Sequence, residues 1–407
     1  MYQKSKIFFF ILIALLALDT DLYSQITSSP YSIFGLGSVE GNSTGINNAM
    51  GGTGIAFLSG QTLNLSNPAS TGGIDSLLTI FEIGFEGKYT SFTTSRRSQS
   101  LFDANFKYID MGFRLTRRWV ISTGIAPYST VGYNINVMSP IEGSTQLFNK
   151  TYKGEGGVNK FFIGNSVRLT RNLLIGINAV YLFGNVTHSE SSEDFNYTLE
   201  ERTYLSNFNL NYGLNYQFSI NSWKYNLGFI YDNGKTLLTD KTSTLTAGTE
   251  YTTMKSSSTE LRVPKSFGFG FAFGKDYFRG GIDYEKRRWE NVEFTNPLLK
   301  SRNSNRYSFG IEIPSLGIRR GGSKMIFYRF GAEYSESYMI IKGIPVNYRS
   351  VSLGTGIPVK GFLSVLNLSF ELGQNGTLQG GLFKESFCTF RVDISLKDIW
   401  FMKRKYM

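Results

Sequence analysis

The sequence has almost none of the side chains that most catalytic and metal sites use. Its 407 residues include one cysteine, Cys388, and one histidine, His188. A disulfide within the chain needs two cysteines, and zinc sites take most of their ligands from Cys and His. Nucleophilic pairs of the Ser–His or Cys–His kind need a histidine as base, but His188 lies among Ser and Glu residues that predict a solvated external loop. We therefore expect no enzyme, no metal site and no cofactor.

Long apolar runs are also scarce. One run, Ile7–Leu18, follows two lysines near the N-terminus and holds 12 residues, which is too short to cross a bilayer comfortably. With a small residue at Ser24, it predicts a secretory signal peptide over residues 1–24. An uncleaved anchor helix is the alternative. No later apolar run reaches the length of a transmembrane helix, so none is expected in the mature chain.

Charge is low in amount but unbalanced in sign. Charged residues make up 18% of the chain, against roughly 25% in soluble domains. The formal net charge is +11, yet Lys and Arg are scattered and form no compact basic stripe. Such a stripe is the usual footprint of nucleic-acid binding. We expect no nucleic-acid partner and a basic surface that faces solvent or lipid headgroups.

Aromatic residues are plentiful, at 15%, and they alternate with small or polar residues. Between residues 207 and 220, Phe, Leu and Tyr occupy every second position and face Asn, Gly, Gln and Ser. Four Phe between residues 266 and 273 alternate with Ser, Gly and Ala. This period predicts strands with one apolar face. A soluble sandwich would share it, but the runs approach the roughly 9–11 residues of a membrane strand rather than the usual 5–6.

The order of short and long links favours a membrane barrel. Short turns at one end, long loops at the other and an even strand number are typical of outer-membrane barrels, which close because lipid cannot satisfy a free edge. We expect an all-β fold, a 14-stranded antiparallel transmembrane β-barrel over residues 77–401, in outer-membrane lipid of a Gram-negative cell. Both termini would be periplasmic, with a short basic tail at 402–407. The predicted strands begin near residues 77, 106, 119, 159, 173, 206, 223, 265, 277, 302, 325, 346, 363 and 387. The predicted long links are 90–105, 136–158, 187–205, 233–264, 289–301, 335–345 and 373–386.

Residues between the lipid-facing positions point into the lumen, and many are charged. Buried charges need partners or water, so these residues either form salt bridges that stiffen the wall and hold a plug, or line a polar path or ligand site. Fourteen strands enclose more space than side chains fill. The Gly-rich, non-alternating segment 25–76 is the expected N-terminal hatch in that space. The predicted lumen charges are Glu82, Glu86, Arg114, Arg279, Asp283, Arg329, Glu333 and Arg391.

Two strings in that segment carry a family resemblance. Ala49-Met50-Gly51-Gly52-Thr53-Gly54-Ile55-Ala56, followed by Ser66-Asn67-Pro68-Ala69-Ser70, resembles the hatch of the FadL family of outer-membrane transporters. The opening 29–37 and the ending 398–406 are similar to a Bacteroidetes branch of such barrels, which also resembles the shuttle barrel of type 9 secretion. The hatch and gating residues that the resemblance marks are Met50, Gly51, Gly52, Gly54, Asn67, Pro68 and Ala69.

The resemblance implies passive, hatch-gated uptake of small hydrophobic molecules. It also implies that Pro127 kinks the third strand and opens a lateral path to the bilayer, although an ordinary strand end near the rim is equally compatible with that proline. The charged lumen and long loops favour an alternative, a non-transporting barrel that is a partner in protein secretion or surface assembly. The possible ligand-lining residues are Ile33, Phe34, Leu36, Ile55, Phe57 and Leu58.

Overall fold

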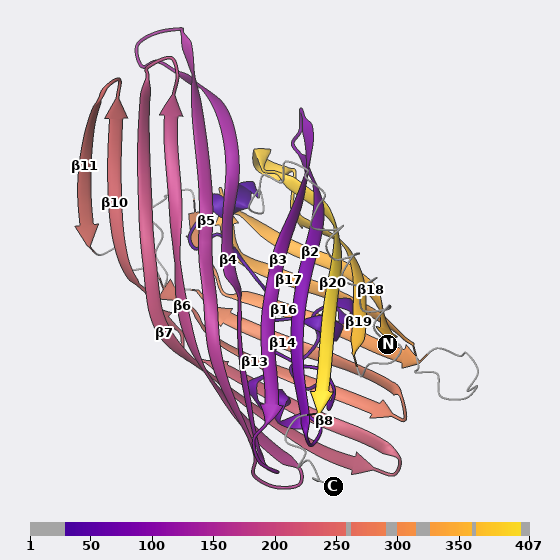
Figure 1. Ribbon diagram of the computed structural model, residues 1–407. Helices are drawn as coiled ribbons and strands as arrows, with labels where there is room; N and C mark the ends of the chain where they lie inside the picture. Colours follow the sequence, from indigo (N-terminus) through magenta and orange to yellow (C-terminus); the bar gives the residue numbers. More distant parts are fainter. Residues whose placement is uncertain (1–28, 258–261, 290–298, 315–325, 360–363, 400–407) are drawn as a thin grey trace, which may run out of the picture.

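Fourteen antiparallel strands close into a barrel in the computed structural model, as expected from the sequence (Figure 1). The structure describes residues 29–257, 262–289, 299–314, 326–359 and 364–399. The predicted signal peptide and basic tail lie outside these residues. The ring closes where β2 pairs with β20. The barrel strands are β2 (Leu78–Thr93), β3 (Ser98–Arg114), β4 (Trp119–Pro140), β5 (Leu147–Arg168), β6 (Leu173–Ser192), β7 (Tyr197–Ile220), β8 (Trp223–Asp232), β13 (Lys265–Lys275), β14 (Phe278–Arg288), β16 (Ser304–Pro314), β17 (Phe327–Ile341), β18 (Ile344–Pro358), β19 (Val365–Gly376) and β20 (Lys384–Ile399).

The alternation in the sequence separates the two faces of this wall. On β13 the aromatic side chains point outward, and Phe269 is 53% exposed on the bare protein surface. The glycines between them face the lumen, where a Cβ at Gly268 or Gly270 would meet hatch residue Ile55. Outward aromatics suit lipid, and inward glycines let the hatch backbone approach the wall.

The predicted long loops at 90–105, 136–158, 187–205 and 335–345 are wrong, because strands run through them. β4, β5, β6 and β7 have 20 to 24 residues each, whereas β8, β13, β14 and β16 have 10 or 11. We call β4–β7 the tall wall, and β8, β13, β14 and β16 the short wall. Strand segments that leave the membrane no longer need an apolar face, so their Ser, Thr and Asn content gave a loop-like pattern.

A hairpin extends the tall wall on one side, as Figure 1 shows. It consists of β10 (Leu238–Ala247) and β11 (Glu250–Ser257), both inside the predicted loop 233–264. β10 pairs with β7 from Ser206 upward, where β8 no longer reaches. The remaining short strands are β9 (Lys235–Thr236), β12 (Arg262–Val263) and β15 (Leu299–Ser301).

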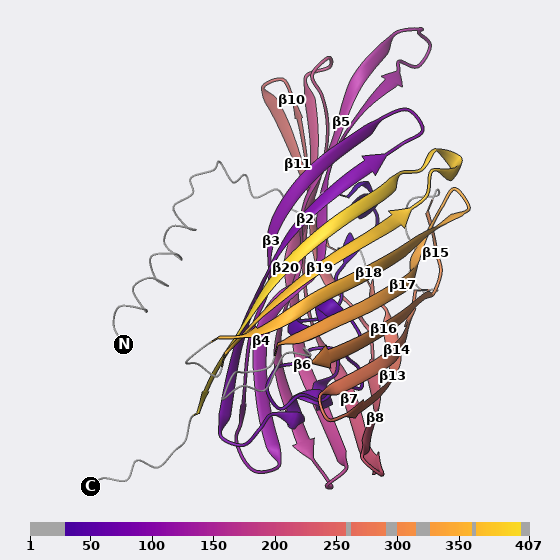
Figure 2. The ribbon, with the colours of Figure 1, turned by 90° about the vertical axis from the view of Figure 1, so that its right-hand side faces the viewer.

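Residues 29–76 precede the barrel strands, and most of them lie inside the barrel (Figure 2); we call this segment the hatch. Their elements are η1 (Pro30–Ile33), β1 (Ser38–Val39), η2 (Gly45–Met50) and η3 (Pro68–Gly73). η2 contacts β16 to β20, and η3 contacts β4 to β7. The hatch therefore touches most of the circumference.

The lumen also contains an apolar cluster nearer the long hairpins. We call that side the loop end, and the side of the short β3–β4, β5–β6, β7–β8 and β13–β14 turns the turn end. The apolar cluster joins hatch residues Tyr31 and Leu36 to Val131, Trp289 and Tyr338. Among the described residues, no helix is both long and apolar enough to cross a membrane.

Candidate functional site

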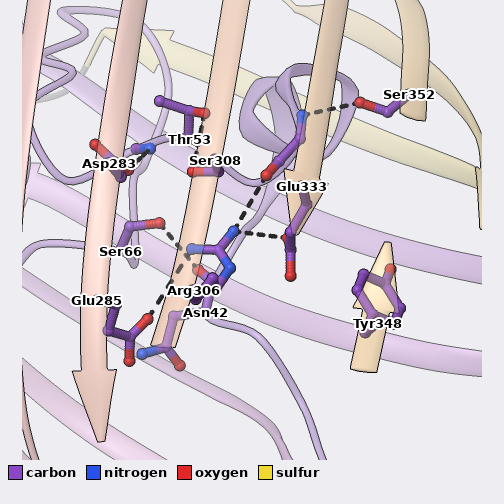
Figure 3. Close-up of polar contacts among 12 residues, drawn as sticks. Asn42, Thr53, Ser66, Asp283, Glu285, Arg306, Ser308, Glu333, Tyr348 and Ser352 are labelled. Atoms are coloured by element: carbon purple, nitrogen blue, oxygen red, sulfur yellow. Dashed lines mark hydrogen bonds and ion pairs between the residues drawn. The ribbon is translucent and has the colours of Figure 1, made fainter. Parts of the chain in front are cut away.

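Polar side chains of the wall hold the hatch backbone directly. Asp283 of β14 accepts hydrogen bonds from the N–H groups of Gly54, at 2.6 Å, and Ile55, at 2.9 Å. Ser352 of β18 accepts from the N–H of Gly51 at 2.8 Å. Arg306 of β16 donates to the Gly51 carbonyl at 3.2 Å (Figure 3). The Gly51–Ile55 string is thus fixed to three strands.

Gly51 has a further reason to be glycine. It ends η2 with φ of 62°, in the left-handed region, which residues with a Cβ rarely adopt. A Cβ there would also lie 2.6 Å from the Ala332 carbonyl oxygen. Met50 beside it is completely buried. The wall glycines Gly310 and Gly331 face Met50, so backbones meet without side chains between them.

The Asn67-Pro68-Ala69 motif starts η3. Asn67 Oδ1 accepts from the Ala69 N–H at 2.9 Å, which caps the helix, and Pro68 occupies its first position. Asn67 Nδ2 donates to the Ile55 carbonyl at 2.7 Å and to Leu214 of β7 at 3.1 Å. One side chain therefore joins the two hatch strings to each other and to the wall.

The predicted lumen charges all lie at the inner wall, where each contacts the hatch or an opposite charge. Glu312 forms ion pairs with both Arg279 and Arg329, with Nε–O distances of 2.6 Å each. Arg391 joins Glu86 at 2.5 Å and Glu371 at 2.6 Å. The remaining contacts are Glu333 with Arg306 at 2.9 Å, Arg114 Nε with the Ile74 carbonyl at 2.9 Å, Glu82 with the Leu63 N–H at 3.3 Å, and Asp283 with Gly54 and Ile55 as above.

A polar chamber of about 290 Å³ lies between η2 and the apolar cluster. Its wall holds more acids than bases, so it is a poor resting place for an apolar molecule. Some of these residues are seen in Figure 3. The charged residues that line it are Glu40, Glu86, Glu285, Glu333, Glu336, Glu371, Glu385, Lys88, Lys107, Arg287, Arg306 and Arg391.

The wall has a lateral gap between β3 and β4. These strands pair only from Arg114↔Val120 to Ile109↔Ile125, although the structure describes both strands in full and both continue toward the loop end. Figure 1 shows them diverging. Each strand bulges at the point of separation, β3 at Lys107 and β4 between Pro127 and Ser129. Bulges bend a strand and increase its twist, so Pro127 lies at the base of the gap, which forms a cavity of about 270 Å³.

The hatch covers this gap from inside. β1 forms an antiparallel ladder with β4, pairing Ser38 with Thr130 and Val39 with Ser129. The Glu40 N–H donates to the Tyr128 carbonyl at 2.9 Å, and the Glu40 carboxylate lies 2.6 Å from Lys107 of β3. The first part of the hatch thus occupies the place that β3 leaves beside β4.

The six possible ligand-lining residues do not form one pocket. Leu36 belongs to the apolar cluster at the loop end, with Ile33 and Phe34 packed against it. Phe57 belongs to a second cluster with Met50 and Ala272. Ile55 is buried against the wall, and Leu58 is half-buried.

His188 is not in a solvated loop, so that expectation is wrong. It lies on β6, and its Nδ1 is 2.7 Å from the Tyr133 hydroxyl of β4. Strand pairing continues past Asn185 into the predicted loop and turns His188 inward.

The sequence pattern did not indicate Lys107, Glu40 and Arg306, which link the hatch to the wall. Simple alternation places Tyr108 inward and Lys107 outward, but the bulge lets both reach the lumen. Glu40 follows glycine-rich residues without a period, so its partner could not be inferred. The inward Glu285 of β14 and Glu333 of β17 could have indicated a basic partner, which is Arg306.

Comparisons place this architecture among known proteins. A family model described as BamG matches residues 3–407. A search of curated proteins finds no match. The Pseudomonas putida toluene transporter TodX has a similar structure, with 16% identity, a TM-score of 0.61, and coverage of 89% of this chain and 100% of TodX. For the Ralstonia pickettii toluene transporter TbuX the values are 13%, 0.59, 88% and 99%. The similarity shows that the fold is that of a FadL-like outer-membrane barrel.

Proposed function

The chain belongs to the BamG family, and we propose that it is a hatch-gated outer-membrane barrel that passes small hydrophobic molecules sideways into the membrane. The observation that carries this proposal is the lateral gap between β3 and β4, covered from inside by β1. A gap in the wall gives an apolar solute a route into lipid that avoids the far side of the barrel.

The surfaces beside the gap suit such a solute better than the chamber does. Tyr31, Leu36 and Val131 of the apolar cluster lie where the hatch meets β4, and Val39 packs against them. Displacement of residues 29–40 would therefore uncover apolar side chains at the edge of the gap. TodX and TbuX are described as toluene transporters, and a monoaromatic hydrocarbon is a suitable first test substrate.

The proposal assigns roles to the predicted segments. Residues 1–24 would direct export, residues 25–76 would gate, and residues 77–401 would span the outer membrane with both termini periplasmic. Met50, Gly51, Gly52, Gly54, Asn67, Pro68 and Ala69 would fix the resting position of the hatch, and Pro127 would maintain the bend at the gap. No catalytic reaction is assigned.

Gly37→Ala tests the proposal. Gly37 has φ of +84°, and a Cβ there would collide with the Thr130 carbonyl, so β1 should detach from β4. Gly41→Ala is the matched control, because its Cβ would meet only Ser43 Oγ at 3.8 Å. We expect cells that express Gly37→Ala to take up radiolabelled toluene several-fold faster than wild type, and Gly41→Ala to match wild type. Uptake equal to that of cells without the protein, in both wild type and Gly37→Ala, would refute the proposal.

A second candidate function is favoured by the chamber. Its ion pairs and the hatch tethers suit a permanently closed barrel that assists secretion or surface assembly as a partner. Gentle affinity purification from outer membranes separates the candidates. A stable large complex together with absent toluene uptake would favour the partner role, whereas a lone monomer would count against it.

A further inference from the structure

We propose that the loop-end part of β4, residues 133–140, docks an extended β-strand of a second polypeptide. β4 pairs with β5 along its whole length, from Trp119↔Val167 to Pro140↔Leu147. On its other side the β3 ladder stops at Ile125, and the β1 ladder adds only Ser129 and Thr130. The last third of β4 is therefore a strand edge that faces the gap.

The direction of the backbone groups follows from the contacts just below. The Tyr128 carbonyl accepts from the Glu40 N–H, and the Gly132 carbonyl accepts from the Ser29 N–H at 2.8 Å. Successive backbone groups alternate sides along a strand, so Asn134, Asn136 and Met138 direct their N–H and C=O groups to this same side. All three residues are exposed, and in the described part of the chain no backbone partner is found there.

This edge lacks the features that usually prevent strand addition. Exposed edges are generally protected by Lys, Pro or a bulge. Within residues 133–140 the single such feature is Pro140 at the end of the strand, and Tyr133–Ser139 has none and offers exposed Val137 and Met138. The outer edge of the β10–β11 hairpin does have such a feature, because β11 contains Lys255.

The occupant is inferred from what already binds lower on the same edge. β1 is an extended segment that joins β4 by an antiparallel ladder, so the edge accepts a strand in that geometry. Acyl chains cannot satisfy backbone N–H and C=O groups, whereas an extended polypeptide satisfies them without a specific sequence. This inference does not depend on solute transport, because it rests on the backbone groups of β4 beyond the β1 ladder and not on any movement of the hatch.

A peptide-binding experiment tests it. The probe is a fluorescein-labelled peptide of residues 98–108, SQSLFDANFKY, because β3 already pairs with β4 nearer the turn end. Fluorescence anisotropy would follow its binding to the purified mature protein in lipid nanodiscs. Asn136→Pro removes one N–H from the edge and leaves the backbone ladder with β5 in place. Asn136→Ala is the matched control, because both variants lose the hydrogen bond that Thr151 of β5 donates to the Asn136 side chain.

We expect saturable binding to wild type and Asn136→Ala. Asn136→Pro should bind with about fivefold or greater loss of affinity, which corresponds to the loss of one backbone hydrogen bond. Heat-modifiable gel migration would verify folding, and Asn134→Pro replaces any variant that fails to fold. Absence of saturable binding to wild type, or equal binding to Asn136→Pro, would overturn the inference. So would tenfold tighter binding after removal of residues 25–28, since the chain's own N-terminus would then be the occupant.

Discussion

The pKa of His188 reflects the buried environment inside the tall wall. Burial lowers the pKa of its imidazole, while Glu201 of β7 raises that pKa and Lys241 of β10 lowers it. The Tyr133 hydroxyl bonds to the ring. Because the lowering prevails, the folded protein favours the neutral ring.

The pH dependence follows from that direction. Below the ordinary value of about 6.5, the unfolded chain takes up a proton that the folded chain resists, so stability falls as the pH drops from there toward the folded pKa. Since His188 is the only histidine, an untagged sample with ¹³C-labelled histidine gives one NMR titration. We expect a midpoint below 6.5 and a weaker acid destabilisation in His188→Gln. A midpoint above 6.5 would contradict the burial argument.

Asn67→Ala should loosen the hatch more than the barrel. The change removes the cap of η3 and two hydrogen bonds, at a cost of about 2–3 kcal/mol to hatch docking. We predict faster amide exchange across residues 45–73, measured by hydrogen–deuterium exchange, with the barrel strands unchanged. Asn149→Ala, at an exposed site on β5, is the control and should leave that exchange unaltered. Uniform acceleration in all strands would show that Asn67 stabilises the whole fold instead.

At the scale of elements, the sequence predicted the barrel better than its gap. Observed strand starts such as Trp119, Leu173, Trp223 and Lys265 coincide with the predicted ones, because alternation is strict where one face meets lipid. The β10–β11 hairpin was missed, because neither face there is uniformly apolar. The separation of β3 from β4 depends on bulges and on hatch contacts that are distant in sequence. No local sequence pattern predicts such bulges or contacts.

The pairing of β1 with β4 can be locked. Val39 and Ser129 are directly opposite in an antiparallel ladder, where Cα atoms lie within the usual disulfide range. In a Cys388→Ser background, Val39→Cys with Ser129→Cys should form a disulfide on oxidation. We expect toluene uptake to fall to the level of cells without the protein and to recover after reduction. Uptake that is unaffected by an intact disulfide, verified by mass spectrometry, would show that β1 need not move.

At the scale of the whole molecule, the two walls have different heights. At about 3.3 Å per residue and a tilt near 45°, the 11 residues of β13 rise roughly 25 Å, which matches the apolar band of an outer-membrane barrel. The 22 residues of β4 rise about twice as far. The short wall thus just spans the membrane, and the tall wall projects beyond it at the loop end.

The η2 part of the hatch and the apolar cluster close the lumen at two levels, with the chamber between them. In electrical terms these are two resistances in series, so the barrel should not conduct ions. We predict no conductance steps for wild type or Gly37→Ala in planar bilayers, since detaching β1 opens a side route and leaves the Gly51–Ile55 tethers intact. Stable ohmic channels in wild type would contradict this. A cell could therefore carry many copies of this barrel without weakening the outer membrane as a barrier to salts and water-soluble antibiotics.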